Sequence, residues 1–164
     1  MDTERTSSKK VWKLGIVDVG PVVLSHCDNP AKDEAIDFMR QVLTGEIDAV
    51  IPLSTFINAY HIMTHFLGVR KYPAAKEIQR TLRLFSPKFI EDLPLEVCLF
   101  AMDITSRFNL GGWDSYLVAL SHTIGVAKIY TLNQELTKVD TLRLVSPISE
   151  GTLAAFHDWL KKKM

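Results

Sequence analysis

Cysteine, net charge and long apolar runs are scarce or absent in this sequence. Its 164 residues include two cysteines, Cys27 and Cys98, which belong to no C-x-x-C pair and therefore form no zinc or redox motif. A disulfide between them is disfavoured in a reducing compartment, so we expect both to be small buried hydrophobic residues. The formal net charge is zero, so the composition indicates no broad basic face for binding nucleic acid through its phosphates.

Membrane segments and common nucleotide or nucleophile motifs are missing as well. No apolar run approaches the roughly 20 residues that a membrane helix needs. Residues 1–11 are polar and lack the apolar region of a signal peptide, so we expect a flexible tail followed by one cytoplasmic domain over 12–164. The sequence contains no G-x-S-x-G, Walker or G-x-G-x-x-G motif.

What the sequence does contain is a regular alternation of short apolar runs and amphipathic stretches. Hydrophobic residues make up 47% and charged residues 23%, which is typical of a globular domain. The pattern predicts strands at 12–18, 48–52, 88–90, 127–132 and 142–147, and helices at about 30–44, 54–67, 74–85, 94–108, 113–124 and 152–162. Strands that are apolar on both faces and separated by helices form parallel sheets covered on both sides. The predicted fold is therefore α/β, a three-layer α/β/α domain with a parallel sheet of about four to five strands.

Polar side chains gather where the predicted strands end. Asp18 ends the first strand, and Asp114 opens a helix directly after two glycines. Ligands of open parallel sheets bind beyond the carboxyl ends of the strands. Two carboxylates about 5 Å apart repel by about 3 kcal/mol at an effective dielectric constant near 20, a cost that a bound Mg²⁺ or Mn²⁺ removes. The same residues also fit a plainer interpretation, in which each Asp only caps a turn or a helix.

Four stretches together resemble the PIN domain, and most closely the VapC-like ribonucleases, which are the toxins of toxin–antitoxin pairs. They read IVDVGPVVLS, VIPLSTFINAYHIMTHFLGV, WDSYLVALSHTIGVAKIYTLNQEL and LRLVSP, and the resemblance covers residues 13–147. It implies a parallel sheet with helices on both sides, an acidic pocket that binds Mg²⁺ or Mn²⁺, and cleavage of RNA. It also implies a homodimer and an antitoxin partner. Asp18 and Asp114 match two of the family's acidic positions.

The other two acidic positions of the family are altered. The helix after the second strand, which usually carries a Glu, reads Asn58, Ala59 and Tyr60, and the last acidic position is Asn133, with Glu135 two residues later. We therefore expect one weakly held ion rather than two. The predicted catalytic and metal-binding residues are Asp18, Asp114 and Glu135. The predicted substrate-binding residues are Asn133, Tyr60 and Thr131.

Three alternative interpretations remain open from the sequence. A PIN-like domain with fewer carboxylates retains the fold and binds RNA or protein without efficient catalysis. A phosphate-responsive receiver domain also has a strand-end Asp and a Thr such as Thr131, but its paired acids are missing here. His61 and His65 have the spacing of zinc proteases without the accompanying Glu, and we expect them to be packed or hydrogen-bonded in a buried helix.

Overall fold

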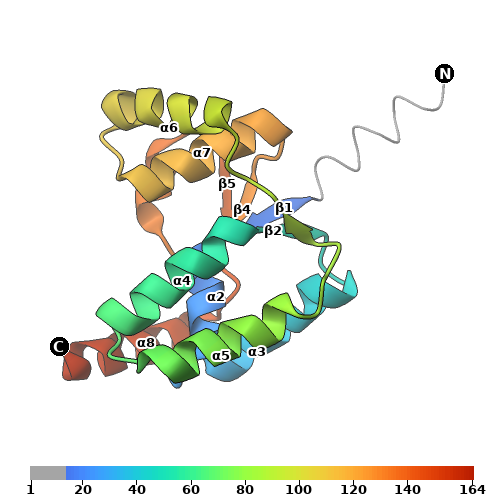
Figure 1. Ribbon diagram of the computed structural model, residues 1–164. Coiled ribbons are helices and arrows are strands. Elements are labelled where there is room, and N and C mark those ends of the chain that lie inside the picture. Colours follow the sequence, from blue (N-terminus) through green and yellow to red (C-terminus); the bar gives the residue numbers. More distant parts are fainter. Residues whose placement is uncertain (1–13) are drawn as a thin grey trace.

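The computed structural model describes residues 14–164, so the predicted tail over 1–11 lies outside the described residues. The chain forms a three-layer α/β/α fold around one parallel sheet, as predicted (Figure 1). The strand order is β3-β2-β1-β4-β5, so the first strand lies at the centre. The strands are β1 (Gly15–Val17), β2 (Ala49–Pro52), β3 (Phe89–Ile90), β4 (Lys128–Tyr130) and β5 (Arg143–Val145).

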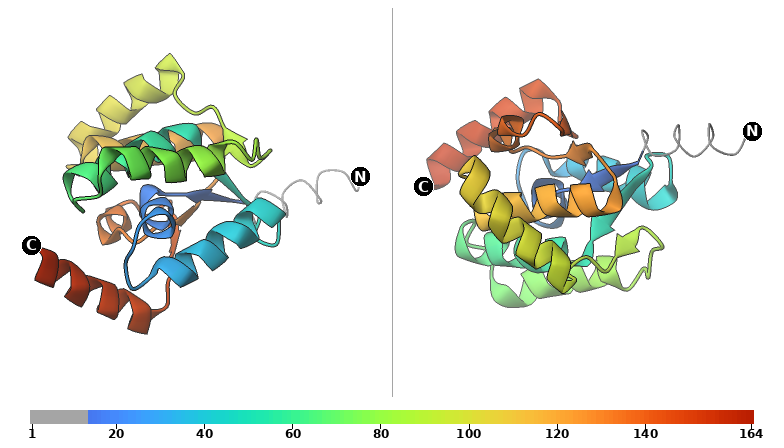
Figure 2. Two further views of the ribbon diagram at one scale, coloured as in Figure 1. Left: turned by 60° about the horizontal axis from the view of Figure 1, so that its bottom comes forward. Right: turned by 90° about the horizontal axis from the view of Figure 1, so that it is seen from above.

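The helices are divided between the two faces of the sheet. They are α2 (Val19–His26), α3 (Lys32–Thr44), α4 (Leu53–His65), α5 (Lys71–Leu82), α6 (Leu95–Phe108), α7 (Gly112–Ile124) and α8 (Glu150–Lys163), with a short 3₁₀ helix η1 (Gln134–Lys138). Helices α6 and α7 pack on each other and cover one face (Figures 1 and 2). The other helices lie on the opposite side, where α2 contacts both α3 and α4.

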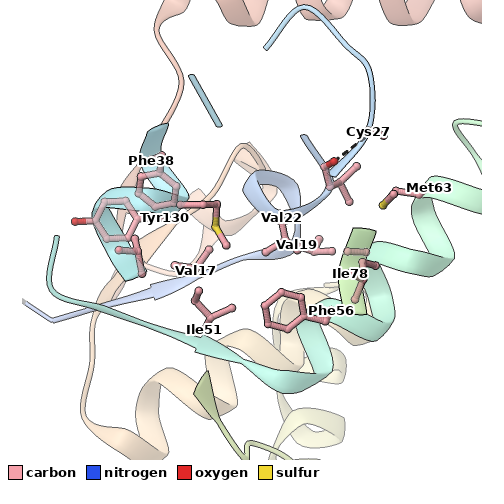
Figure 3. Close-up of a cluster of buried hydrophobic side chains, with 14 of the residues drawn as sticks. Val17, Val19, Val22, Cys27, Phe38, Ile51, Phe56, Met63, Ile78 and Tyr130 are labelled. Carbon is pink, nitrogen blue, oxygen red and sulfur yellow. Dashed lines mark hydrogen bonds between the residues drawn. The ribbon is translucent and has the colours of Figure 1, made fainter. Parts of the chain in front are cut away.

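Strand register explains how the core forms on both faces. Ile16 pairs with Val50 on one side and Ile129 on the other, and these three side chains face the α6–α7 layer. The next residue, Val17, points to the opposite face, where it joins the cluster drawn in Figure 3 together with Phe56. Successive residues of a strand point to opposite faces, so strands buried on both sides must be apolar throughout, as observed in the sequence.

No helix was predicted between the first strand and residue 30, but the structure contains helix α2 there. The chain turns into this helix directly after Asp18, whose side chain caps it. Six of its eight residues are buried, so the stretch has little amphipathic periodicity and gave no helical signal. Pro21 lies in the first turn, where a residue without an N–H group is tolerated. The helix therefore begins at the carboxyl end of β1, with Asp18 between the two elements.

Two further expectations about burial are wrong. Helix α4 is not buried all round, because the Ile57 side chain is 71% exposed and both histidines of this helix are exposed. Cys27 is buried as expected, but Cys98 is exposed, and neither cysteine forms a disulfide. Within residues 14–164, no helix combines the length and apolar character needed to cross a bilayer.

Candidate acidic site at the carboxyl edge of the sheet

Asp18 is a buried carboxylate held by donors from three parts of the chain. Its Oδ1 accepts hydrogen bonds from the Val19 backbone N–H at 2.6 Å and from the indole N–H of Trp113 at 2.9 Å. Its Oδ2 accepts the hydroxyl hydrogen of Thr131 at 2.6 Å. The residue is only 3% exposed. Hydrogen bonds to an ionised group are stronger than neutral ones and compensate for its burial, so this carboxylate ties β1, α7 and β4 together.

Asp114 lies in the first turn of α7, where the helix dipole favours a negative charge. Partial burial raises the pKa of its carboxyl group above the usual value, and the negative charges of Asp18 and Glu135 raise it further. A hydrogen bond from the Asn133 side-chain amide at 2.9 Å acts in the opposite direction. Asp18 and Asp114 are far apart in sequence, and the contribution of Asp18 to this pKa shift indicates that they lie near each other in the fold.

The segment after β4 closes a hydrogen-bond network around the two acids. Thr131 donates to Asp18 and accepts the backbone N–H of Asn133 at 2.9 Å. Asn133 in turn donates to Asp114 and accepts the backbone N–H of Glu135 at 2.9 Å. Thr131 is buried, with 3% exposure, so it contributes to the site by orienting Asp18. Asn133 links the two halves of the network.

The two remaining predicted site residues lie at the margin of this network. The Glu135 side chain is exposed and forms an ion pair with Lys138 on the same turn of η1. Tyr60 is half-buried in α4 and packs against the core cluster of Figure 3. Among the described residues, no hydrogen bond joins the Tyr60 hydroxyl to the acidic network. The structure therefore brings together Asp18, Asp114, Thr131 and Asn133, and places the side chains of Glu135 and Tyr60 outside this network, although the Glu135 backbone N–H donates to Asn133.

The donor set decides which metal ion this site fits. Among residues 14–164, no three His, Cys, Asp or Glu side chains gather closely enough to hold a metal ion, so Asp18, Asp114 and Glu135 do not form a three-carboxylate cluster. Oδ1 of Asp18 already accepts two hydrogen bonds, whereas Oδ2 of Asp18 and both oxygens of Asp114 keep free lone pairs. Mg²⁺ is typically held by one or two carboxylates and several waters. The residues present fit one hydrated ion of this kind and do not fit two.

A second buried carboxylate at the same edge was not predicted as part of the site. Asp92 follows β3, is 5% exposed, and its Oδ1 accepts the backbone N–H of Ser54 in the first turn of α4 at 3.1 Å. Its Oδ2 accepts the hydroxyl hydrogen of Tyr116 from α7. Burial and this bond raise the pKa of the Tyr116 hydroxyl far above its ordinary value, and the charge of Asp18 contributes to the shift. The signal was present in the sequence, since Asp92 follows a predicted strand just as Asp18 does.

Trp113 was also missed as a partner of Asp18. It directly precedes Asp114, and its ring packs against Tyr116 with centroids 4.9 Å apart. The clue in the sequence was a Trp beside the predicted site residue Asp114, because a partly buried indole N–H needs an acceptor. Trp113 and Tyr116 thereby connect the network of Asp18 with that of Asp92.

This chain is similar to known proteins in its fold and not in its overall sequence. No protein-family model matches the sequence, and no curated protein matches it. Among solved structures, VapBC2 from Rickettsia felis, bound to a DNA fragment from its promoter, aligns with a TM-score of 0.58 at 10% identity over 80% of this chain and 97% of that one. FitAcB from Neisseria gonorrhoeae aligns with a TM-score of 0.56 at 14% identity over 81% of this chain and 97% of that one.

A third similar structure is PAE2754 from Pyrobaculum aerophilum, with a TM-score of 0.53 at 13% identity over 93% of this chain and 96% of that one. Identities this low carry information about the backbone arrangement alone. The chain therefore has a PIN-like three-layer α/β/α fold, with its polar network at the carboxyl edge of the sheet.

Proposed function

We propose that this protein is a PIN-type, divalent-metal-dependent endoribonuclease with a weak, single-ion site. The observation that carries this proposal is the convergence of Asp18 and Asp114, whose like charges interact across a polar network at the carboxyl edge of the sheet. Placing two such charges together is unfavourable for folding. A cation bound between the two carboxylates would offset this repulsion.

Each residue of the network has its own role in the proposed site. Asp114 and the free lone pair of Asp18 Oδ2 would hold one Mg²⁺ or Mn²⁺. A bound ion of this type activates water and neutralises charge on a phosphodiester. Trp113 and Thr131 fix the rotamer of Asp18, so little side-chain entropy is lost on binding. Asn133 holds Asp114 and presents a neutral amide where a further carboxylate would repel RNA phosphates.

The substitution that tests the activity is Asp114→Asn, because Asn keeps the shape of the side chain and the oxygen that accepts the bond from Asn133. Cleavage of a mixed RNA pool should be measured with Mn²⁺ and with EDTA. We expect slow cleavage by the wild type with Mn²⁺ and at least a tenfold loss in the variant. Asp103→Asn, an exposed acid on α6, is the matched control. Equal traces for wild type and Asp114→Asn would end the nuclease proposal.

A second candidate function is a catalytically silent domain that binds RNA or protein. Two observations favour it, namely that Oδ1 of Asp18 is saturated by protein donors and that α4 offers Asn58, Ala59 and Tyr60 where the resemblance expects an acid. RNA binding without cleavage, equal in wild type and Asp114→Asn, would support this function over the first.

An antitoxin-like protein partner is part of the first proposal. It is supported by the likeness of the fold to VapBC2 and FitAcB, together with the sequence resemblance to the VapC-like toxins. It is also supported by an apolar cavity of about 360 Å³ beside the acidic site. The cavity is lined by residues of α2, α4 and α8 and by Leu132, which precedes Asn133. Leu160→Asp in this cavity should abolish association with a co-expressed antitoxin, whereas His157→Ala on the exposed side of α8 should not.

A further inference from the structure

The outer face of α4 carries two histidines that the proposed function does not use. His61 and His65 are one helical turn apart, and both are exposed. Their ring centroids are 4.1 Å apart, with an angle of 32° between the ring planes. Two imidazoles one turn apart on the same helix face can turn their nitrogens toward one transition-metal ion such as Zn²⁺ by side-chain rotation.

The hydrogen bonds of His65 leave one of its nitrogens available. Its Nδ1 lies 3.2 Å from the backbone carbonyl oxygen of His61, and a carbonyl can only accept. The Thr64 hydroxyl oxygen also lies 3.2 Å from Nδ1, so this nitrogen faces groups of its own helix. In the tautomer that donates from Nδ1 to the carbonyl, Nε2 keeps its lone pair. Metal-binding histidines usually donate their second nitrogen to such an acceptor, which fixes the tautomer and the ring orientation. Within residues 14–164, no hydrogen bond engages Nε2 of His65 or either ring nitrogen of His61.

The pair alone does not complete a zinc site. Zn²⁺ prefers four ligands in a tetrahedron, but no third His, Cys, Asp or Glu joins these two within the described part of the chain. Ile57, one turn before His61, and Phe66, whose ring edge meets His61 with centroids 5.8 Å apart, are both 71% exposed. Two copies related by a twofold axis present the same patch to each other, which supplies four imidazoles and covers these apolar side chains.

We propose that His61 and His65 form a half-site for Zn²⁺ that is completed by the same pair of a second copy. The formal net charge of zero means that long-range repulsion between copies does not oppose this contact. The site lies on the outside of α4, separate from the acidic network, so the inference does not depend on nuclease activity.

Light scattering of the full chain in EDTA and after addition of ZnCl₂ tests this inference. We expect the molar mass to at least double, with one Zn²⁺ bound per two chains. The variant with His61→Ala and His65→Ala should show no change in mass, while His122→Ala with His157→Ala, two exposed histidines elsewhere, should respond like the wild type. Asp114→Asn should also respond like the wild type, which separates this site from the acidic one.

Three results would overturn the inference. These are no mass increase in the wild type at saturating Zn²⁺, one ion bound per chain without a change in mass, or an increase that persists in the variant lacking both α4 histidines. Both substitutions replace exposed helix positions with the best helix former, so loss of folding does not confound the comparison.

Discussion

The two acids of the network should respond in opposite ways to removal. Asp18→Ala deletes the cap of α2 and leaves the indole N–H of Trp113 without its acceptor. A lost helix cap costs about 1 kcal/mol, and an orphaned, partly buried donor costs roughly 1–3 kcal/mol. We therefore expect a loss of about 3 kcal/mol in the free energy of unfolding. For a domain of this size that corresponds to a fall in Tm of about 6–12 °C.

Asp114→Asn should leave Tm unchanged or raise it at pH 7. The raised pKa of this carboxyl means that the folded state binds its proton more tightly than the unfolded chain does. Its contribution to stability is therefore complete at low pH and is lost as pH rises through the folded-state value. Asn removes that loss and keeps the acceptor for Asn133. The advantage of the variant over the wild type should shrink as pH is lowered toward 3.

Thermal unfolding followed by circular dichroism, with Asp18→Asn as the matched control, measures both effects. Asp18→Asn keeps an oxygen for Val19 and Trp113, so it should lose less than Asp18→Ala. A melting temperature of Asp18→Ala within about 2 °C of the wild type would show that neither the cap nor the Trp113 acceptor stabilises the fold, contrary to this prediction. So would a larger loss in Asp114→Asn than in Asp18→Ala.

Three further predictions follow from buried groups elsewhere. Burial lowers the pKa of His26, so the unfolded state takes up a proton at a higher pH than the folded state does. The free energy of unfolding should therefore fall as the pH drops below about 6.5. Urea titrations at pH 5 and pH 8 should show a smaller pH dependence for His26→Gln than for the wild type. Tyr116→Phe leaves Asp92 with one donor fewer and should lower the free energy of unfolding by about 1–3 kcal/mol, a loss that Tyr72→Phe, on the exposed side of α5, should not show. Gly15→Ala should be destabilising by chemical denaturation, because a Cβ there would lie 2.8 Å from Cδ2 of Tyr130, whereas Gly151→Ala meets open space and should not destabilise.

The sequence predicted the fold well because its strands are apolar on both faces and are separated by helices. Parallel order, five strands and the position of Asp18 at a strand end all follow from that pattern. The position of Asp18 and Asp114 in one hydrogen-bond network at the carboxyl edge is consistent with the sequence, in which one ends a strand and the other begins a helix after two glycines.

The parts that could not be predicted depend on long-range contacts. Helix α2 is buried on nearly every side, so periodicity does not reveal it. The exposed position of His61 and His65 depends on which face of α4 meets α2 and α5, and apolar residues lie all round that helix. Similarly, Asp92 reaches the first turn of α4 only because β3 lies beside β2. In each case the sequence gives the residue type, and the tertiary packing determines its partner.

The proposed function depends on a divalent cation held by Asp18 and Asp114. A crystal of the protein soaked in MnCl₂ tests it most directly, because the anomalous signal of manganese locates the ion without reference to activity. We expect one peak between the two carboxylates, surrounded by waters, and no peak there in Asp114→Asn. Well-ordered Asp18 and Asp114 side chains without manganese between them would contradict it.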